Sequence, residues 1–380
     1  MSSNNGNKAE GAARSRGFTL PPVKEDGGDW LRQFSDCLNQ RAPEESAFAT
    51  PNEIYRVLPT MRLRAFGGRS RSGAGATLIV APLAAQDASM ADLMRGHSLV
   101  EVLRAAGNGP VYLTDWKSAT TDMRACSIDS YLSDLNVAID DLGGDVDVVG
   151  LCQGGWLALI HAARFPGKIR RLVLAGTPVD VSVRPSSMTR YVASLPSGKI
   201  RDLDASVTGV VAGSDVLTAL GAGHGHDRAA IETLQRNPAS FTDRDMRAIS
   251  TYESWCRRGM DLPALTCQQM LTWLFRENRL AQGTFEALGQ IIDLKRVRIP
   301  IFVLCGKFDD VTPKEQALSV LSLVGTGKGR VRSLVATCGH FALFVGAGTL
   351  TREWSVIASW LGSPASLGKK ASAPLSLVAK

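Results

Sequence analysis

The chain has 380 residues, of which 44% are hydrophobic and 21% charged, so it is long enough to bury a large core as one domain with an insertion or as two domains. The formal charge is +7, but short basic runs at 62–71, 295–298 and 369–370 hold much of the excess, and no recognised nucleic-acid-binding module accompanies them. Nucleic acid is therefore not an expected partner.

The seven cysteines are widely spaced and include no C-x-x-C pair, which argues against a zinc site or a dithiol redox site and favours a reducing compartment. The first 17 residues are polar and small, with no apolar signal-peptide core, and no apolar run approaches the length of a transmembrane helix. These features predict a soluble cytoplasmic protein without a bound metal.

Taken in chain order, residues 1–27 are rich in Ser, Asn, Gly and charge and are predicted to form a disordered tail. Residues 362–380 have the same character and predict a second tail. The catalytic domain is expected to span 28–361.

Within that span, short β-branched runs alternate with longer helical patterns, which predicts an α/β fold with a mostly parallel sheet covered by helices on both faces. The strand candidates are 76–83, 111–116, 146–151, 169–176, 299–306 and 329–337, and the helix candidates between them are 98–107, 127–143 and 154–166.

The pattern changes between about 180 and 290, where helical segments carry many charges and surround the stretch GAGHGHD at 221–227. This section interrupts the series of strands. We expect an inserted helical cap over the carboxyl edge of the sheet, because ligands of open α/β sheets bind at that edge.

A cysteine stands at the tip of a predicted strand-to-helix turn, in the stretch VVGLCQGGW at 148–156. Cys152 follows the strand, Gly150 and Gly154 lie two residues away on either side, Gly155 follows, and a helical pattern continues to Pro166. A turn this tight requires small neighbours, so the stretch is typical of a nucleophile elbow. The alternative interpretation is a buried, unreactive cysteine.

A thiol nucleophile needs a base, and in this arrangement the histidine should come last in the chain. His340 follows the last predicted strand and is the candidate. His161 lies about two turns along the helix after the elbow and is interpreted as structural, and His97 precedes the first crossover helix. His224 and His226 belong to the glycine-rich stretch, where a metal or substrate role is the alternative to a structural one.

The acid that orients the histidine should follow the strand candidate at 299–306. Asp309 and Asp310 are both available, and the proline four residues after the first of them favours Asp309, with Asp310 as the fallback. The alternative interpretation is the start of a helix, a role that Thr312 fills equally well.

The oxyanion of an acyl-transfer intermediate needs two amide donors. One is expected to be the amide of Gln153, which follows the nucleophile. The other is expected near Leu83 or Ala84, in the loop after the first predicted strand.

Four stretches together resemble the polyhydroxyalkanoate synthases and the related intracellular polyhydroxyalkanoate depolymerases of the α/β-hydrolase superfamily. Residues 150–181 are similar to the lipase-like box G-x-C-x-G-G and its following strand, and 111–116 (VYLTDW) to the segment ahead of it. Residues 278–313 resemble the approach to the catalytic aspartate, and 338–346 (CGHFALFVG) the histidine loop.

The resemblance implies that Cys152 carries the acyl group, with His340 as base and Asp309 as its partner. It implies (R)-3-hydroxyacyl-coenzyme A or the derived polyester as substrate, with coenzyme A entering as a thioester rather than as a cofactor. The expected activity is an acyltransferase, with a polyester or thioester hydrolase using the same triad as the alternative. A catalytically silent scaffold protein is a third possibility.

Some details divide between the two activities. The double glycine at Gly154 and Gly155 favours a synthase, whereas the loop at 81–100 and the TDWKSA and FDD details are closer to the depolymerases, and Trp156 is bulkier than the usual synthase residue. The chain length resembles that of the catalytic subunit of two-subunit synthases. A second synthase subunit, a granule-associated protein and a homodimer are therefore the protein partners under consideration, with the cytoplasm or the polyester granule as location.

Overall fold

The computed structural model describes residues 48–67, 75–84, 86–107, 109–203, 208–215, 227, 231 and 242–363. The predicted tail 1–27 and residues 364–380 of the second predicted tail lie outside this range. Among the described residues, no helix has the length and apolar character needed to cross a membrane.

An eight-stranded sheet forms the centre of the fold, in the order β1-β2-β6-β3-β7-β8-β13-β14. The six strands from β6 to β14 are parallel, while β1 and β2 form an antiparallel hairpin that continues the sheet beyond β6. The strands are β1 (Asn52–Val57), β2 (Met61–Phe66), β3 (Thr77–Val80), β6 (Val111–Trp116), β7 (Val146–Leu151), β8 (Ile169–Ala175), β13 (Ile301–Gly306) and β14 (Val331–Ala336).

All six predicted strands are present, and five of them, β3, β6, β7, β8 and β13, consist wholly or almost wholly of buried residues. This is the expected property of parallel strands that are covered on both faces. The prediction missed β1 and β2. The hairpin lies at the sheet edge, and β1 is largely exposed, so its sequence lacks the continuous apolar run that marks the inner strands.

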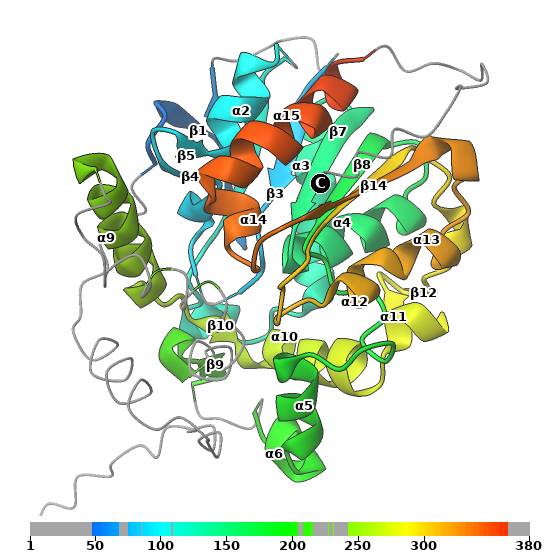
Figure 1. The fold of residues 1–380 in the computed structure, drawn as a ribbon. Helices are drawn as coiled ribbons and strands as arrows, with labels where there is room; N and C mark the ends of the chain where they lie inside the picture. Colours follow the sequence, from blue (N-terminus) through cyan, green and yellow to red (C-terminus); the bar gives the residue numbers. More distant parts are fainter. Residues whose placement is uncertain are drawn as a thin grey trace, which may run out of the picture.

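Helices cover the two faces of the sheet (Figure 1). Helices α2 (Leu99–Ala105) and α15 (Ala347–Gly362) pack together on one face, and α3 (Ile128–Asp141) and α4 (Gln153–Arg164) on the other. Helix α4 is buried on almost every side, which explains its nearly uniform apolar sequence. The shorter helices are α12 (Lys314–Leu318), α13 (Val320–Leu323) and α14 (Ala342–Val345).

The segment between β8 and β13 is the one expected to form the cap, and it is called the cap below; Figure 1 shows its elements α5, α6 and α10 gathered at one end of the sheet. The main chain of its Gly259 pairs with that of Gln86 in the loop after β3. The cap elements are α5 (Ser187–Ser194), α6 (Ser197–Arg201), β9 (Val210–Val211), α9 (Asp243–Arg257), β10 (Leu262–Pro263), α10 (Ala264–Gln269), a π-helix (Met270–Arg276), α11 (Arg279–Gln282), β11 (Glu286–Ala287) and β12 (Gln290–Ile291).

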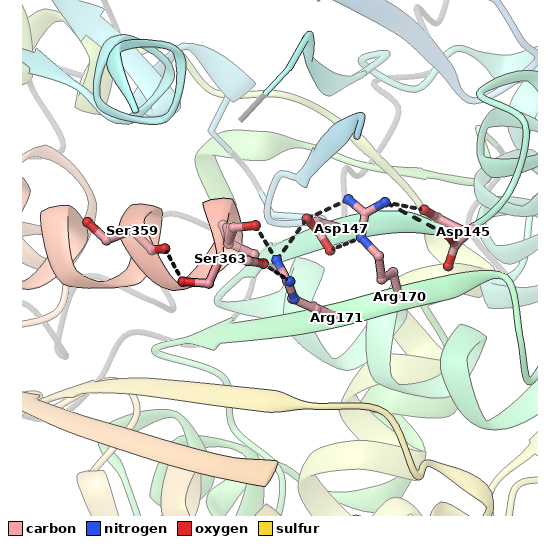
Figure 2. A network of polar contacts seen from close by, with 7 residues as sticks. Asp145, Asp147, Arg170, Arg171, Ser359 and Ser363 are labelled. Carbon is pink, nitrogen blue, oxygen red and sulfur yellow. Dashed lines mark hydrogen bonds and ion pairs between the residues drawn. The ribbon is translucent and has the colours of Figure 1, made fainter. Parts of the chain in front are cut away.

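A buried ion network joins the amino-terminal ends of β7 and β8 to the end of α15 (Figure 2). The carboxylate of Asp147, only 1% exposed, accepts two hydrogen bonds from Arg170, at 3.0 and 2.7 Å. Its other neighbour, Arg171, lies 3.8 Å away and donates to the main-chain oxygens of Leu361 and Ser363. Because a buried charge is tolerated only when it is paired, the network fixes the last helix at the sheet edge opposite the elbow.

Candidate active site

The turn between β7 and α4 places Cys152 at its tip with the backbone of a nucleophile elbow. Cys152 has φ 47° and ψ −116°, a conformation that a residue with a side chain adopts only under constraint. The amide of Cys152 donates to the main-chain oxygen of Ala175 at 2.8 Å, so the neighbouring strand β8 holds the tip. The strain is therefore imposed by the surrounding sheet and helix.

Three glycines allow the elbow to approach its neighbours closely. A Cβ atom on Gly150 would collide with the main chain of Gly155, and one on Gly154 would collide with the main-chain oxygens of Val80 and Ala81. A Cβ atom on Gly155 would collide with the side chain of Thr177. The two glycines of the double glycine are thus required by different contacts. Gly154 lies against backbone atoms, whereas Gly155 lies against a side chain.

The acid and the base of the proposed triad lie in direct contact. Nδ1 of His340 is 2.7 Å from Oδ2 of Asp309, and both side chains are almost completely buried. The other oxygen, Oδ1, accepts hydrogen bonds from the amides of Val311 and Thr312 at 2.9 and 2.7 Å, so the carboxylate cannot rotate freely. Asp310 is exposed, and this geometry favours Asp309 over it.

The histidine also contacts the elbow cysteine. Burial opposes a charge on the imidazole, but the charges of Asp309 and Cys152 and their hydrogen bonds to the ring raise the pKa of His340 well above its ordinary value. Since Nδ1 faces Asp309, Nε2 is the nitrogen available to the thiol. The structure therefore brings together the cysteine, histidine and aspartate that the sequence nominated.

A mostly apolar pocket opens beside the cysteine, with about 590 Å³ of empty space, part of it open to solvent. Cys152, Gln153 and His340 form part of its wall. The remaining wall includes residues from the loop after β3, the cap and the histidine loop, among them Pro82, Ala84, Met188, Trp255, Phe275 and Phe344. Such a lining suits an acyl chain beside a reacting carbonyl.

The two residues predicted to donate to the oxyanion can be located in the fold. Gln153 is the first residue of α4, where amides lack partners within the helix. Leu83 is completely buried between Pro82 and Ala84, both of which line the pocket. Their role as donors remains a prediction.

Two other histidines, His161 and His97, are not among the residues that line this pocket. His161 is fully buried in α4, with Nε2 3.2 Å from Oδ1 of Asn136, as expected of a structural residue. Nδ1 of His97 lies 2.8 Å from the main-chain oxygen of Val345. His224 and His226 lie outside the described residues. In the part of the chain that is described, no group of three or more His, Cys, Asp or Glu side chains is arranged to hold a metal ion.

The sequence did not identify the cap residues that line the pocket. Met188, Trp255 and Phe275 come from three different elements of the insertion. A helical pattern predicts which face of a helix is apolar, but not whether that face meets the core or a ligand. The sequence signal that could have identified these residues is the presence of large apolar side chains in the otherwise charged cap segment.

Comparison with solved structures places the fold among the α/β hydrolases, as predicted. A crystal structure of the monoacylglycerol lipase of Paleococcus ferrophilus superposes with a TM-score of 0.52 at 16% identity, covering 79% of this chain and 98% of the lipase. Identity this low demonstrates a shared fold only.

Residues 125–367 match the protein family described as "Protein of unknown function (DUF3141)", and the chain belongs to this family. The chain is also similar to poly(3-hydroxyalkanoate) polymerase subunits PhaC, which confirms the resemblance drawn from the motifs. The subunit of Haloferax mediterranei is 24% identical over 86% of this chain, and that of Allochromatium vinosum is 24% identical over 72%.

The chain spans 66% of the length of the Haloferax protein and 76% of that of the Allochromatium protein. It also matches an uncharacterized protein of Rhizobium meliloti with 29% identity, covering 58% of this chain but only 31% of that protein. Several relatives therefore contain long regions that have no counterpart in this chain.

Proposed function

We propose that this protein is an acyltransferase of polyhydroxyalkanoate metabolism that forms a covalent acyl-cysteine at Cys152. The observation that carries the proposal is a strained elbow cysteine in contact with a buried His340–Asp309 pair beside an apolar pocket. The similarity to poly(3-hydroxyalkanoate) polymerase subunits supports this choice of acyl group and reaction.

In the first half-reaction, Nε2 of His340 takes the thiol proton and Sγ of Cys152 attacks the thioester carbonyl of a 3-hydroxyacyl-coenzyme A. The amides of Gln153 and Leu83 are the proposed donors to the oxyanion. The bond between the carbonyl carbon and the coenzyme A sulfur then breaks, and His340 returns its proton to the leaving thiolate. The products are free coenzyme A and an acyl-cysteine.

In the second half-reaction, a hydroxyl group attacks the acyl-cysteine while His340 accepts its proton, and the Cys152 thiol is regenerated. A hydroxyacyl chain as attacking group lengthens a polyester, whereas water releases a free acid. Exchange of an acyl group between two thiols is nearly balanced in energy, so the cysteine holds the chain without trapping it.

The direct test is to incubate the purified protein with (R)-3-hydroxybutyryl-coenzyme A and measure free thiol and insoluble polymer. The proposal expects coenzyme A release accompanied by polymer. Release without polymer, or soluble acid formed from added polymer granules, would show that the enzyme is a hydrolase.

Two substitutions at the nucleophile control this test. Cys152→Ala should abolish release of coenzyme A and the thiol labelling of this position. Cys152→Ser keeps the size of the side chain but replaces the thiol by a poorer nucleophile, and it should lose most of the activity. If Cys152→Ala and His340→Ala both turn over at the rate of the natural protein, these residues do not form the catalytic site; if the natural protein itself shows no turnover, the chain is a scaffold rather than this enzyme.

We further propose that the chain works with another protein, since several similar proteins are named as polymerase subunits. A second synthase subunit, a granule-associated protein and a second copy of this chain are the candidates, and the surface of a polyester granule in the cytoplasm is the proposed location. Adding candidate subunits to the polymerisation assay tests the first two, and light scattering tests the third.

A further inference from the structure

A second buried carboxylate, Asp227 of the cap insertion, contacts the loop that carries the catalytic histidine. Its Oδ2 accepts a hydrogen bond from the amide of Phe341 at 2.9 Å, and its Oδ1 accepts one from the amide of Ala342 at 3.4 Å. These two residues follow His340 directly: Phe341 precedes helix α14 and Ala342 is its first residue, where amides have no partner within the helix. Asp227 therefore caps this helix from a part of the chain more than 110 residues away.

Asp227 packs closely against the histidine loop at Gly339. Asp227 is 8% exposed, and a Cβ atom on Gly339 would lie 2.5 Å from its Oδ1. The residue just before the histidine therefore has to be glycine for the carboxylate to reach the two amides just after it. Contacts on both sides of His340 fix the backbone from which the imidazole extends.

Aromatic residues of the cap hold the same loop from another direction. The ring of Phe341 packs edge-on against Tyr252 and Trp255 of α9, with ring centroids 5.8 and 5.4 Å apart. Trp255 also lines the pocket. The histidine loop is thus held by the cap as well as by the sheet, and Asp227 adds a charged contact to these aromatic ones.

We propose that Asp227 is a positioning residue for the catalytic histidine, which it acts on by fixing the backbone of residues 339–342 against the cap. Asp309 fixes the orientation of the imidazole ring through its contact with Nδ1, while Asp227 fixes the position of the backbone that carries the His340 side chain. Proton transfer depends steeply on the placement of the base, so a small shift of this loop weakens the base even when Asp309 is intact.

The electrostatics of Asp227 agree with this role. Burial raises the pKa of its carboxyl group, and the Phe341 amide and the nearby charge of His340 act in the opposite direction. The loop contacts therefore offset only part of the cost of burying this carboxylate, and its pKa stays raised. Removing the Asp227 carboxylate should therefore loosen the backbone of the histidine loop.

The proposal uses the Cys152–His340 pair of the proposed function, but it can be tested without an acyl substrate. The measurement is the rate at which iodoacetamide alkylates Cys152, followed by peptide mass spectrometry so that the other cysteines do not interfere. Asp227→Ala should slow alkylation by about tenfold, because the base that accepts the thiol proton is displaced. Asp227→Asn keeps one acceptor for the Phe341 amide and should give an intermediate rate.

The decisive comparison repeats Asp227→Ala in a His340→Ala background. If Asp227 acts through the histidine, the second change has almost no effect on the rate, and the two substitutions are strongly non-additive. An equal loss in both backgrounds, or no loss in either, overturns the proposal. Should Asp227→Ala fail to fold, the same comparison is made with Asp227→Asn.

The matched control is Asp134→Ala. Asp134 is also a buried carboxylate, and it accepts hydrogen bonds at 2.7 Å from the amide and the hydroxyl of Thr60; neither residue lines the pocket. This variant should melt at a lower temperature with an unchanged alkylation rate. If the natural protein shows no acyl transfer, the proposed function is refuted, while the role of Asp227 can still hold. If the effects of Asp227→Ala and His340→Ala on the alkylation rate are additive, the role of Asp227 is refuted, while the proposed function can still hold.

Discussion

Replacing His161 by leucine should make the stability of the protein less sensitive to acid. His161 is fully buried in α4, its Nε2 lies 3.2 Å from Oδ1 of Asn136, and its Nδ1 has no hydrogen-bond partner among the residues that the structure describes. Burial, with a smaller contribution from the charge of Lys168, lowers the pKa of His161 to about 3. The folded protein therefore keeps this ring neutral where an unfolded chain would protonate it.

The size of the effect follows from proton linkage. An unfolded histidine has a pKa of about 6.5, so below that pH the unfolded chain binds a proton that the folded chain refuses, and the free energy of unfolding falls as the pH falls. The loss continues down to the folded pKa of about 3. At pH 5 it amounts to about 2 kcal/mol relative to neutral pH, and it is absent when the residue cannot titrate.

Urea unfolding at pH 7.5, 6 and 5 measures this difference directly. Between pH 7.5 and 5, wild type should lose about 2 kcal/mol more unfolding free energy than His161→Leu. The control is His161→Gln, whose amide can still donate to Asn136; it should show the same pH dependence as leucine and differ only by a constant offset. If wild type and both variants lose equal free energy over this range, the ring is not held neutral and the reasoning fails.

Gly154→Ala should prevent stable folding, because the new methyl group collides with backbone oxygens after β3, whereas Gly198→Ala, with open space around it, should be neutral or should raise the melting temperature slightly. Asp147→Asn should lower the free energy of unfolding by about 3 kcal/mol, since it removes the buried charged partner of Arg171 and leaves Arg170 only the exposed carboxylate of Asp145; a change below about 0.5 kcal/mol in urea titration would argue against a structural network. Asp309→Asn should reduce turnover by at least about 100-fold, and Asp310→Asn should leave it nearly unchanged; the reverse order would exchange their roles.

The elements of the candidate site could be nominated from the sequence because each is a local feature of the chain. The apolar strand ending at Leu151, the glycines around Cys152 and the helix that follows lie within some twenty residues, and backbone sterics permit few conformations for such a stretch. The order of cysteine, aspartate and histidine then reduced the candidates for base and acid to a few.

The choice between Asp309 and Asp310 shows where local information ends. Both carboxylates follow β13, and the sequence favoured the first only by its spacing from a proline. In the fold, Asp309 is buried and bound by two amides and the imidazole, whereas Asp310 is exposed. This difference depends on how the loop after β13 meets the histidine loop, which no local pattern records.

By itself, the sequence determined the parallel sheet, the elbow at Cys152 and the nominated triad, because apolar periodicity and tight-turn sterics act between near neighbours in the chain. Only the tertiary structure decided which cap residues face the pocket and that Asp227 holds the loop of His340. Those contacts join segments separated by about a hundred residues, and they arise from packing against a common surface. Such contacts exist only in the folded chain, so they cannot be predicted from local patterns in the sequence.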